Sequence, residues 1–194
     1  RTVGLAEPKA TRRDVHRRHV ALEAELLVIR KKLAGGARHQ VTFYAEPLGQ
    51  VTRRPGGSDL IFTRDAGGSE FSQIFVLDPI DGSTTMLTDG ESRNGGVSWD
   101  REGRRIAYTS TARNGASNDV WLMDPEAPED RKIVLESPDG TLWAPAEFSK
   151  SGSKMLVANY VSITDARVNL LDLDTGDVTL LACCAAEPSF NVPL

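Results

Sequence analysis

The chain has 194 residues, of which 40% are hydrophobic and 26% are charged, proportions typical of a globular protein of one or two domains. Its net charge of −4 combines +6 on residues 1–40 with −10 on the remainder, and the basic leader has no aromatic residue to stack on a base, so we expect no nucleic-acid partner. No run approaches the roughly 18 consecutive apolar residues that a membrane-spanning helix requires, so we expect no membrane partner either.

Residues 1–35 are predicted to form a leader that contains a helix. Its apolar side chains recur at helical intervals, at Leu22, Leu26, Ile29 and Leu33. Asp14 can cap the start of this helix and Gly35 can end it. A competing interpretation is that the run L-L-V-I at 26–29 is a strand.

The histidines and cysteines predict neither a metal site nor a disulfide. His16 and His19 could face one side of the helix, but no acidic or cysteine partner accompanies them or His39. Cys183 and Cys184 are adjacent, and adjacent cysteines seldom bridge, because a disulfide holds its Cα atoms about 5.5 Å apart. We assign no metal and no cofactor.

From residue 47 onward, a unit of about 47 residues occurs three times. Each unit has a strand candidate, a tight turn, a second strand candidate, a third that ends in aspartate, and a closing one. The turn glycines, expected to supply a positive φ, are Gly57, Gly103 and Gly152. Asp100 and Ser151 are expected to bond back to the backbone of their turns.

Four short antiparallel strands in a repeat of this length are the signature of a β-propeller blade. The runs at 74–77 and 120–123 are apolar on both faces, as expected of strands covered by neighbouring blades on both sides. We therefore predict an all-β fold, a partial β-propeller of about three complete four-stranded antiparallel blades, with an N-terminal helix. The predicted limits are a leader at 1–35, the end of a preceding blade at 36–46 (with the strand candidate V-T-F-Y), blades at 47–92, 93–139 and 140–182, and a tail at 183–194.

Two residue types recur once per blade and are predicted to be structural. Aspartates end the third strands at Asp78, Asp124 and Asp172, and this regularity favours a strand-end role. Tryptophans are expected to fill the space between blades, at Trp99, Trp121 and Trp143.

Two kinds of loop residue are candidates for a functional site. The sequence D-A-G-G-S-E could line a channel and meet a substrate, but we favour the interpretation that its carboxylates cap backbone amides. Its candidate residues are Asp65, Gly67, Gly68 and Glu70. Arg93 and Arg113, each in an R-N-G sequence, could guide a peptide carboxylate. R-N-G also suits a turn, and we favour that interpretation.

Residues 36–182 resemble the propeller of the prolyl-oligopeptidase family of serine peptidases, of the acylaminoacyl-peptidase and dipeptidyl-aminopeptidase type. The similarity is carried by GARHQVTF (36–43), RDAGGSEFSQIFVLD (64–78), the run from LTDG to WLMDP (87–125) and LLDLDTGDVTLL (170–181). The family's turn usually reads S-P-D-G, where this chain has R-P-G-G, D-R-E-G and K-S-G-S.

The resemblance implies a propeller that gates access to a C-terminal α/β-hydrolase domain and admits short peptides. The catalytic serine of that domain lies in a G-x-S-x-G motif, which this chain lacks, and every histidine here precedes residue 40. We therefore assign no catalytic residue, and we expect the chain alone to be inactive. Its peptide substrate would be bound together with a hydrolase domain outside the sequence.

The length leaves the assembly and two other functions open. Seven or eight blades need more than about 300 residues, so either the sequence belongs to a longer protein or another chain completes the ring. One alternative is a non-enzymatic scaffold that binds a protein partner, like the propeller of the periplasmic Tol system. Another is a propeller enzyme with paired carboxylates in its channel, such as a glycosidase.

Overall fold

The computed structural model describes residues 29–31, 38–40, 42–44, 46–65 and 67–183. The chain divides into two compact units, residues 1–47 and 48–194. In the described part of the first unit, β1 (Ile29–Lys31) and β2 (Arg38–Gln40) pair antiparallel. The described residues contain no helix, and so none that is long and apolar enough to cross a membrane.

The predicted N-terminal helix is wrong where it overlaps the described residues. Ile29–Lys31 form a strand, as in the competing interpretation, because pairing with β2 satisfies backbone groups and overrides the helical periodicity. The rest of the predicted helix, at 14–28 and 32–35, lies outside the described residues. The strand expected at V-T-F-Y is also displaced, since residues 42–44 belong to no strand and β2 ends at Gln40. That residues 36–46 end a preceding blade stays a prediction.

Residues 48–183 form three four-stranded antiparallel sheets, each with its strands in sequence order. Blade one consists of β3 (Leu48–Arg53), β4 (Leu60–Asp65), β5 (Ser72–Leu77) and β6 (Thr84–Met86). Blade two consists of β7 (Asn94–Trp99), β8 (Ile106–Ser110), β9 (Asp119–Asp124) and β10 (Ala127–Leu135). Blade three consists of β11 (Leu142–Phe148), β12 (Lys154–Ser162), β13 (Asp165–Asp172) and β14 (Val178–Cys183).

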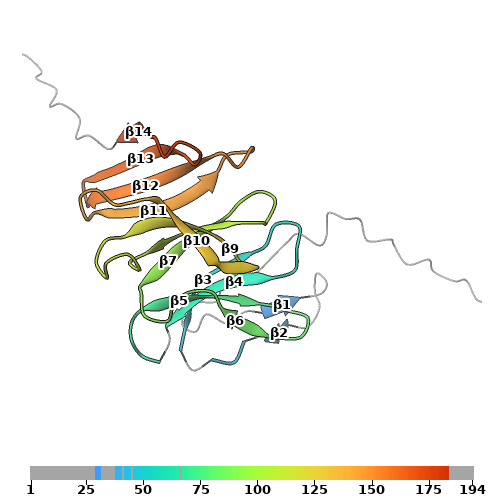
Figure 1. The fold of residues 1–194 in the computed structure, drawn as a ribbon. Coiled ribbons are helices and arrows are strands. Elements are labelled where there is room, and N and C mark those ends of the chain that lie inside the picture. Colours follow the sequence, from blue (N-terminus) through green and yellow to red (C-terminus); the bar gives the residue numbers. More distant parts are fainter. Residues whose placement is uncertain (1–28, 32–37, 41, 45, 66, 184–194) are drawn as a thin grey trace, which may run out of the picture. The chain divides into compact units, whose positions relative to one another are not determined.

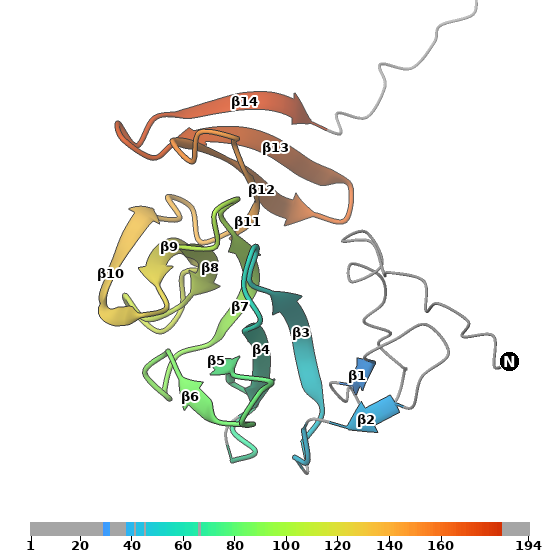
Figure 2. The same ribbon diagram turned by 90° about the vertical axis from the view of Figure 1, so that its right-hand side faces the viewer.

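These sheets confirm the predicted partial β-propeller with three complete blades. Figures 1 and 2 show the sheets of residues 48–183 stacked one on the next. The first strands of neighbouring blades contact each other, β3 with β7 and β7 with β11, so they form the inner edge of the stack. The connection from the third to the fourth strand is short in blade two, because β9 ends at Asp124 and β10 already begins at Ala127.

Apolar clusters fill both seams between the blades. The first seam holds Ile61, Ile74 and Leu87 from blade one, and Val97, Ile106, Tyr108 and Met123 from blade two. The second holds Ala107, Val120, Leu122 and Leu135 from blade two, and Trp143, Phe148, Met155, Val157 and Leu171 from blade three. On β9, therefore, Met123 faces blade one while Val120 and Leu122 face blade three. The middle strand of blade two is dry on both sides, as its apolar run predicts.

The turns between first and second strands are closed by equivalent hydrogen bonds in all three blades. The N–H groups donate to carbonyls three residues earlier, from Gly57 to Arg54, from Gly103 to Asp100 and from Gly152 to Ser149. A positive φ is confirmed at Gly103 (69°) and Gly152 (73°). The prediction is wrong for Gly57, because the positive φ in that turn, 73°, belongs to Gly56. Pro55 and Gly56 hold the two central positions, where a type II turn favours Pro followed by Gly.

Candidate functional site

The recurring aspartates stabilise the turns between the third and fourth strands. In each turn a carboxylate oxygen accepts the N–H two residues on, from Ile80 to Asp78 at 2.7 Å, from Glu126 to Asp124 at 2.9 Å and from Asp174 to Asp172 at 3.1 Å. This is the Asx-turn geometry by which aspartate ends a strand. The predicted strand-end role is confirmed.

Asp172 makes this stabilisation dependent on pH. The N–H groups of Thr175 and Asp174 hold the pKa of the Asp172 carboxyl below its usual value, and the Lys154 ammonium 3.4 Å away acts in the same direction. A lowered folded-state pKa contributes stability above the unfolded pKa, and this contribution is lost as the pH falls through the folded-state pKa. We expect Asp172→Asn to be less stable than wild type at pH 7, with a difference that shrinks below about pH 4. Urea unfolding at several pH values measures it, with Asp174→Asn as the control; a difference that does not change with pH would contradict the prediction.

The D-A-G-G-S-E loop between β4 and β5 is organised by its own aspartate. Asp65 accepts the N–H groups of Ser69 at 3.1 Å and Glu70 at 3.0 Å. Gly67 and Gly68 have φ values of 74° and 76°. The interpretation that this carboxylate caps backbone amides is confirmed for Asp65.

Arg113 belongs to an ion pair with a buried carboxylate. Its Nε and Nη2 donate to the two oxygens of Asp119, at 2.7 and 3.0 Å, and this bond raises the pKa of the Arg113 guanidinium. Asp119 is fully buried and also accepts the N–H of Ser137 at 2.8 Å, so it fastens the loop from β10 to β11. The R-N-G turn is confirmed here, since the Gly115 N–H donates to the Thr111 carbonyl at 2.7 Å.

The R-N-G sequence at Arg93 is not a turn. Asn94 is the first residue of β7, and it is buried with its side-chain amide donating to the Ser92 carbonyl at 2.8 Å. The turn interpretation is therefore wrong at this position, because Asn94 is needed in the packed seam between blades one and two. Arg93 itself is exposed, with its guanidinium 5.2 Å from the centre of the Phe71 ring.

The tryptophans lie in the seams, as predicted. Trp143 is buried in the cluster between blades two and three. Trp99 and Trp121 pack against the cluster between blades one and two, where Trp121 stacks on Tyr108 at a centroid distance of 6.5 Å. Burial raises the pKa of the Tyr108 hydroxyl.

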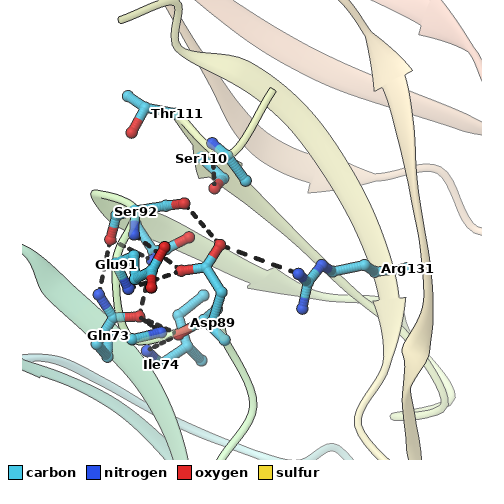
Figure 3. Close-up of polar contacts among 12 residues, drawn as sticks. Gln73, Ile74, Asp89, Glu91, Ser92, Ser110, Thr111 and Arg131 are labelled. Carbon is cyan, nitrogen blue, oxygen red and sulfur yellow. Dashed lines mark hydrogen bonds and ion pairs between the residues drawn. The ribbon is translucent and has the colours of Figure 1, made fainter. Parts of the chain in front are cut away.

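A buried amide, Gln73, fastens the loop between β6 and β7 (Figure 3). Its Oε1 accepts bonds from the Thr88 hydroxyl at 2.7 Å and from the Gly90 N–H at 3.0 Å. Its Nε2 donates to the Ser92 carbonyl at 2.7 Å. Asn94 Nδ2 donates to the same Oε1 at 3.2 Å, so the amide links blade one to the first strand of blade two.

Asp89 lies on the outer side of this cluster and joins it to blade two. The Ser92 hydroxyl donates to Asp89 Oδ2 at 2.6 Å, and Nη2 of Arg131, on β10, lies 3.9 Å from the same oxygen. Burial alone would raise the pKa of the Asp89 carboxyl, but hydrogen bonds from Ser92 and Glu91 outweigh it and lower that pKa. The cluster of Figure 3 is thus internally satisfied and structural.

We expect Gln73→Leu to lower the free energy of unfolding by about 2 kcal/mol, because buried polar groups lose their partner. Gln50→Leu is the matched control. Gln50 also bridges blades one and two, exchanging two hydrogen bonds with the backbone of Val97, but it is exposed, so water can replace it. Chemical denaturation followed by tryptophan fluorescence measures both variants. Equal losses would contradict the assigned role of burial.

The turns between the first and second strands, which we call the inner turns, are joined between neighbouring blades by arginine side chains. Arg54 Nε donates to the Gly103 carbonyl at 2.7 Å, and Arg105 Nη2 donates to the Gly152 carbonyl at 2.9 Å. The turns of blades one and two therefore each bind the turn of the next blade at its glycine.

Each of these arginines also pairs with an acid of its own turn. Arg54 contacts Asp59, and Arg105 contacts Asp100, both at 3.2 Å. The base begins the turn and the acid ends it in blade one, whereas the order is reversed in blade two. Asp100 accepts the Arg104 N–H at 2.8 Å, as predicted. In blade three the equivalent acceptor is Ser149, which receives the Lys154 N–H at 3.1 Å, while Ser151 has only a 3.5 Å contact with the Ser153 N–H.

We call the surface formed by these three turns the inner-turn rim. Its basic residues are Arg53, Arg54, Arg101, Arg104, Arg105, Lys150 and Lys154, and its acidic residues are Asp59, Asp100 and Glu102. Counted over these residues alone, the rim carries a net charge of +4, whereas residues 41–194 together carry −10. Glu126 and Asp172, in the neighbouring turns between third and fourth strands, pair with Arg54 and Lys154 and reduce this charge to +2. Arg101, Arg104 and Lys150 are exposed, and of these Arg104 pairs with Glu102, so Arg101 and Lys150 are the rim cations best placed to attract an acidic ligand.

The described residues contain no group of three or more His, Cys, Asp or Glu side chains that could hold a metal ion. Cys183 is exposed and not bridged. His16, His19, Cys184 and the rest of the predicted tail lie outside the described residues.

Sequence reasoning missed Gln73 and Asp119, which have equivalent structural roles in blades one and two. They lie 46 residues apart, at the start of β5 and β9, so the repeat spacing could have revealed them. Each accepts a backbone N–H from the loop to the next blade, Gly90 in one case and Ser137 in the other. The signal is weak because an amide replaces a carboxylate.

No model of a known protein family matches the chain. A curated relative, the uncharacterised protein Atu1656 of Agrobacterium fabrum, is 31% identical over 128 aligned positions, and the match covers 62% of this chain and 42% of the relative. The chain therefore spans less than half of this relative, and 128 aligned positions at 42% coverage correspond to a length of roughly 300 residues.

Three solved structures have the same fold. The putative TolB of Agrobacterium tumefaciens gives a TM-score of 0.65 at 21% identity, over 82% of this chain and 57% of its own. An oligogalacturonate lyase in complex with manganese gives 0.65 at 15%, over 86% and 44%. A prolyl endopeptidase gives 0.63 at 18%, over 81% and 25%. These similarities identify the class of protein as β-propeller, a fold that peptidases, TolB proteins and lyases share.

Proposed function

We propose that these blades belong to a non-catalytic propeller that binds a protein partner, and that the inner-turn rim receives an acidic segment of that partner. The observation that carries this proposal is the length of the curated relative. About 300 residues accommodate roughly six blades of about 47 residues, with no room for a hydrolase domain as well. The prolyl endopeptidase, by contrast, is matched over only 25% of its chain.

The site chemistry supports the same proposal. Asp65 and Asp89 accept backbone N–H groups of their own loops, while Asp119 accepts the N–H of Ser137 in the β10–β11 loop and pairs with Arg113. The rim instead offers exposed cations on an acidic body, an arrangement that speeds and orients binding of an acidic partner.

The gate of a serine peptidase is the second candidate. It is favoured by the sequence resemblance at residues 87–125 and by the TM-score of 0.63 to the prolyl endopeptidase. The two candidates differ in one chemical property, because only the peptidase has an activated serine.

Treatment of the protein encoded by the complete gene with a fluorophosphonate probe distinguishes them. We expect no covalent labelling, whereas stoichiometric labelling of a serine would overturn the proposal in favour of the peptidase.

Binding of a fluorescent deca-glutamate peptide tests the rim. We expect Arg101→Glu/Lys150→Glu to weaken binding by about 10-fold and added salt to weaken wild-type binding. The matched control is Arg93→Glu/Arg167→Glu, which makes the same change in charge away from the rim. Equal weakening by both double variants would overturn the assignment of the rim.

A further inference from the structure

Blade three has an apolar face on the side away from blade two. Along β12, Met155 and Val157 are buried against blade two, while Leu156 and Tyr160 alternate with them and lie on the other face. Tyr160 is 47% exposed. The residues of this open face are Leu142, Leu156, Tyr160, Val168 and Leu170.

The same positions are covered in the first two blades. The register pairs Ile61 with Val76 in blade one, Ala107 with Leu122 in blade two, and Leu156 with Leu170 in blade three. The first two pairs pack into the seams with blades two and three.

The neighbouring position on the third strand shows the contrast most clearly. It is occupied by Ile74, Val120 and Val168 in the three blades. Ile74 and Val120 are 0% exposed, and Val168 is 41% exposed. The Val168 side chain is apolar, like those of Ile74 and Val120, but no described blade packs over it.

We infer that, in the protein encoded by the complete gene, a further four-stranded blade of the same polypeptide covers the open face. Blades one and two each pack on the blade that follows in sequence, after a loop that joins β6 to β7 or β10 to β11. The chain spans only 42% of its curated relative, which leaves length for such a blade. Covering this face removes a contiguous apolar patch from water, the same gain that holds the two observed seams.

The inner turn of blade three fits this inference. The Lys154 carbonyl accepts the Ser149 N–H, just as the Arg105 carbonyl of blade two accepts the Asp100 N–H. Lys154 and Arg105 therefore close equivalent turns. Arg105 reaches the glycine carbonyl of the next blade. Lys154 thus presents a cation where a fourth blade would bring its own turn carbonyl.

Thiol accessibility in the protein encoded by the complete gene tests the inference. Val168→Cys, which is close to isosteric, is made with Cys183 and Cys184 replaced by serine, and its rate of reaction with a maleimide is measured. Asp174→Cys, at an exposed position of the β13–β14 turn, is the control. We expect Val168→Cys to react at least about 100-fold more slowly than the control, because access requires local opening. In urea the two rates should become equal, which excludes an intrinsic block to the reaction.

Two results would overturn the inference. Reaction of Val168→Cys at the rate of the control would show that the face is free. Protection that disappears on dilution, together with the mass of a dimer in light scattering, would show that a second copy covers it. Protection in a species of monomer mass supports the inference.

Discussion

Replacement of Asp119 by alanine should lower the free energy of unfolding by about 2–4 kcal/mol. Removal of one partner from a buried ion pair costs about 3–5 kcal/mol when the remaining charge stays buried. Here the remaining guanidinium of Arg113 is partly exposed and can be hydrated, so the loss should be smaller. The N–H of Ser137, which also bonds to Asp119, stays buried without its acceptor and adds to the loss.

The chain offers a matched control for this variant. Asp165 and Arg167 form a pair with the same two-bonded geometry, at 3.0 and 2.6 Å, but both side chains reach solvent. Exposed pairs contribute little to stability, so Asp165→Ala should unfold close to wild type. Urea denaturation followed by tryptophan fluorescence gives both values, and a similar loss in the two variants would show that burial of Asp119 is not what matters.

Replacement of Gly103 by alanine should destabilise the seam between blades one and two by roughly 2–5 kcal/mol in total. The φ of 69° costs an alanine about 1–2 kcal/mol. The new Cβ would also lie 2.5 Å from the Pro55 carbonyl oxygen and 3.0 Å from Arg54 Cγ. Relief of that overlap requires backbone movement that costs about 1–3 kcal/mol and disturbs the bond from Arg54 to the Gly103 carbonyl.

Two other glycines separate the strain from the overlap. Gly115 has a φ of 76° and open space around its Cβ position, so Gly115→Ala should show the backbone cost alone. At Gly152 a Cβ would lie 2.9 Å from Arg105 Nη2, the end of a flexible side chain, and the loss should be intermediate. We expect Gly115→Ala to be the most stable of the three variants, Gly152→Ala to be intermediate and Gly103→Ala to be the least stable, measured as urea midpoints. Equal midpoints would contradict the close approach of the two blades.

The strands were predictable because the signals for them are local. The apolar runs of β5 and β9, closed by Asp78 and Asp124, specify a buried strand and its end within six or seven residues. The errors arose where a distant partner decides the conformation. The helical periodicity around Ile29 is overridden by pairing with Gln40, and R-N-G is a turn at Arg113 but enters β7 at Arg93.

The sequence by itself determined the repeat, the order of the strands and the turns that join them, because alternation, Gly, Pro and Asp act over a few residues. Only the tertiary structure decided which polar groups are buried and hydrogen-bonded within the stack of blades, such as Gln73 and Asp119, and which stay exposed on the inner-turn rim. Burial of a strand face depends on the blade stacked against it. For that reason Val120 and Val168, which are the same residue at the same place in the repeat, are dry in one blade and open in the other.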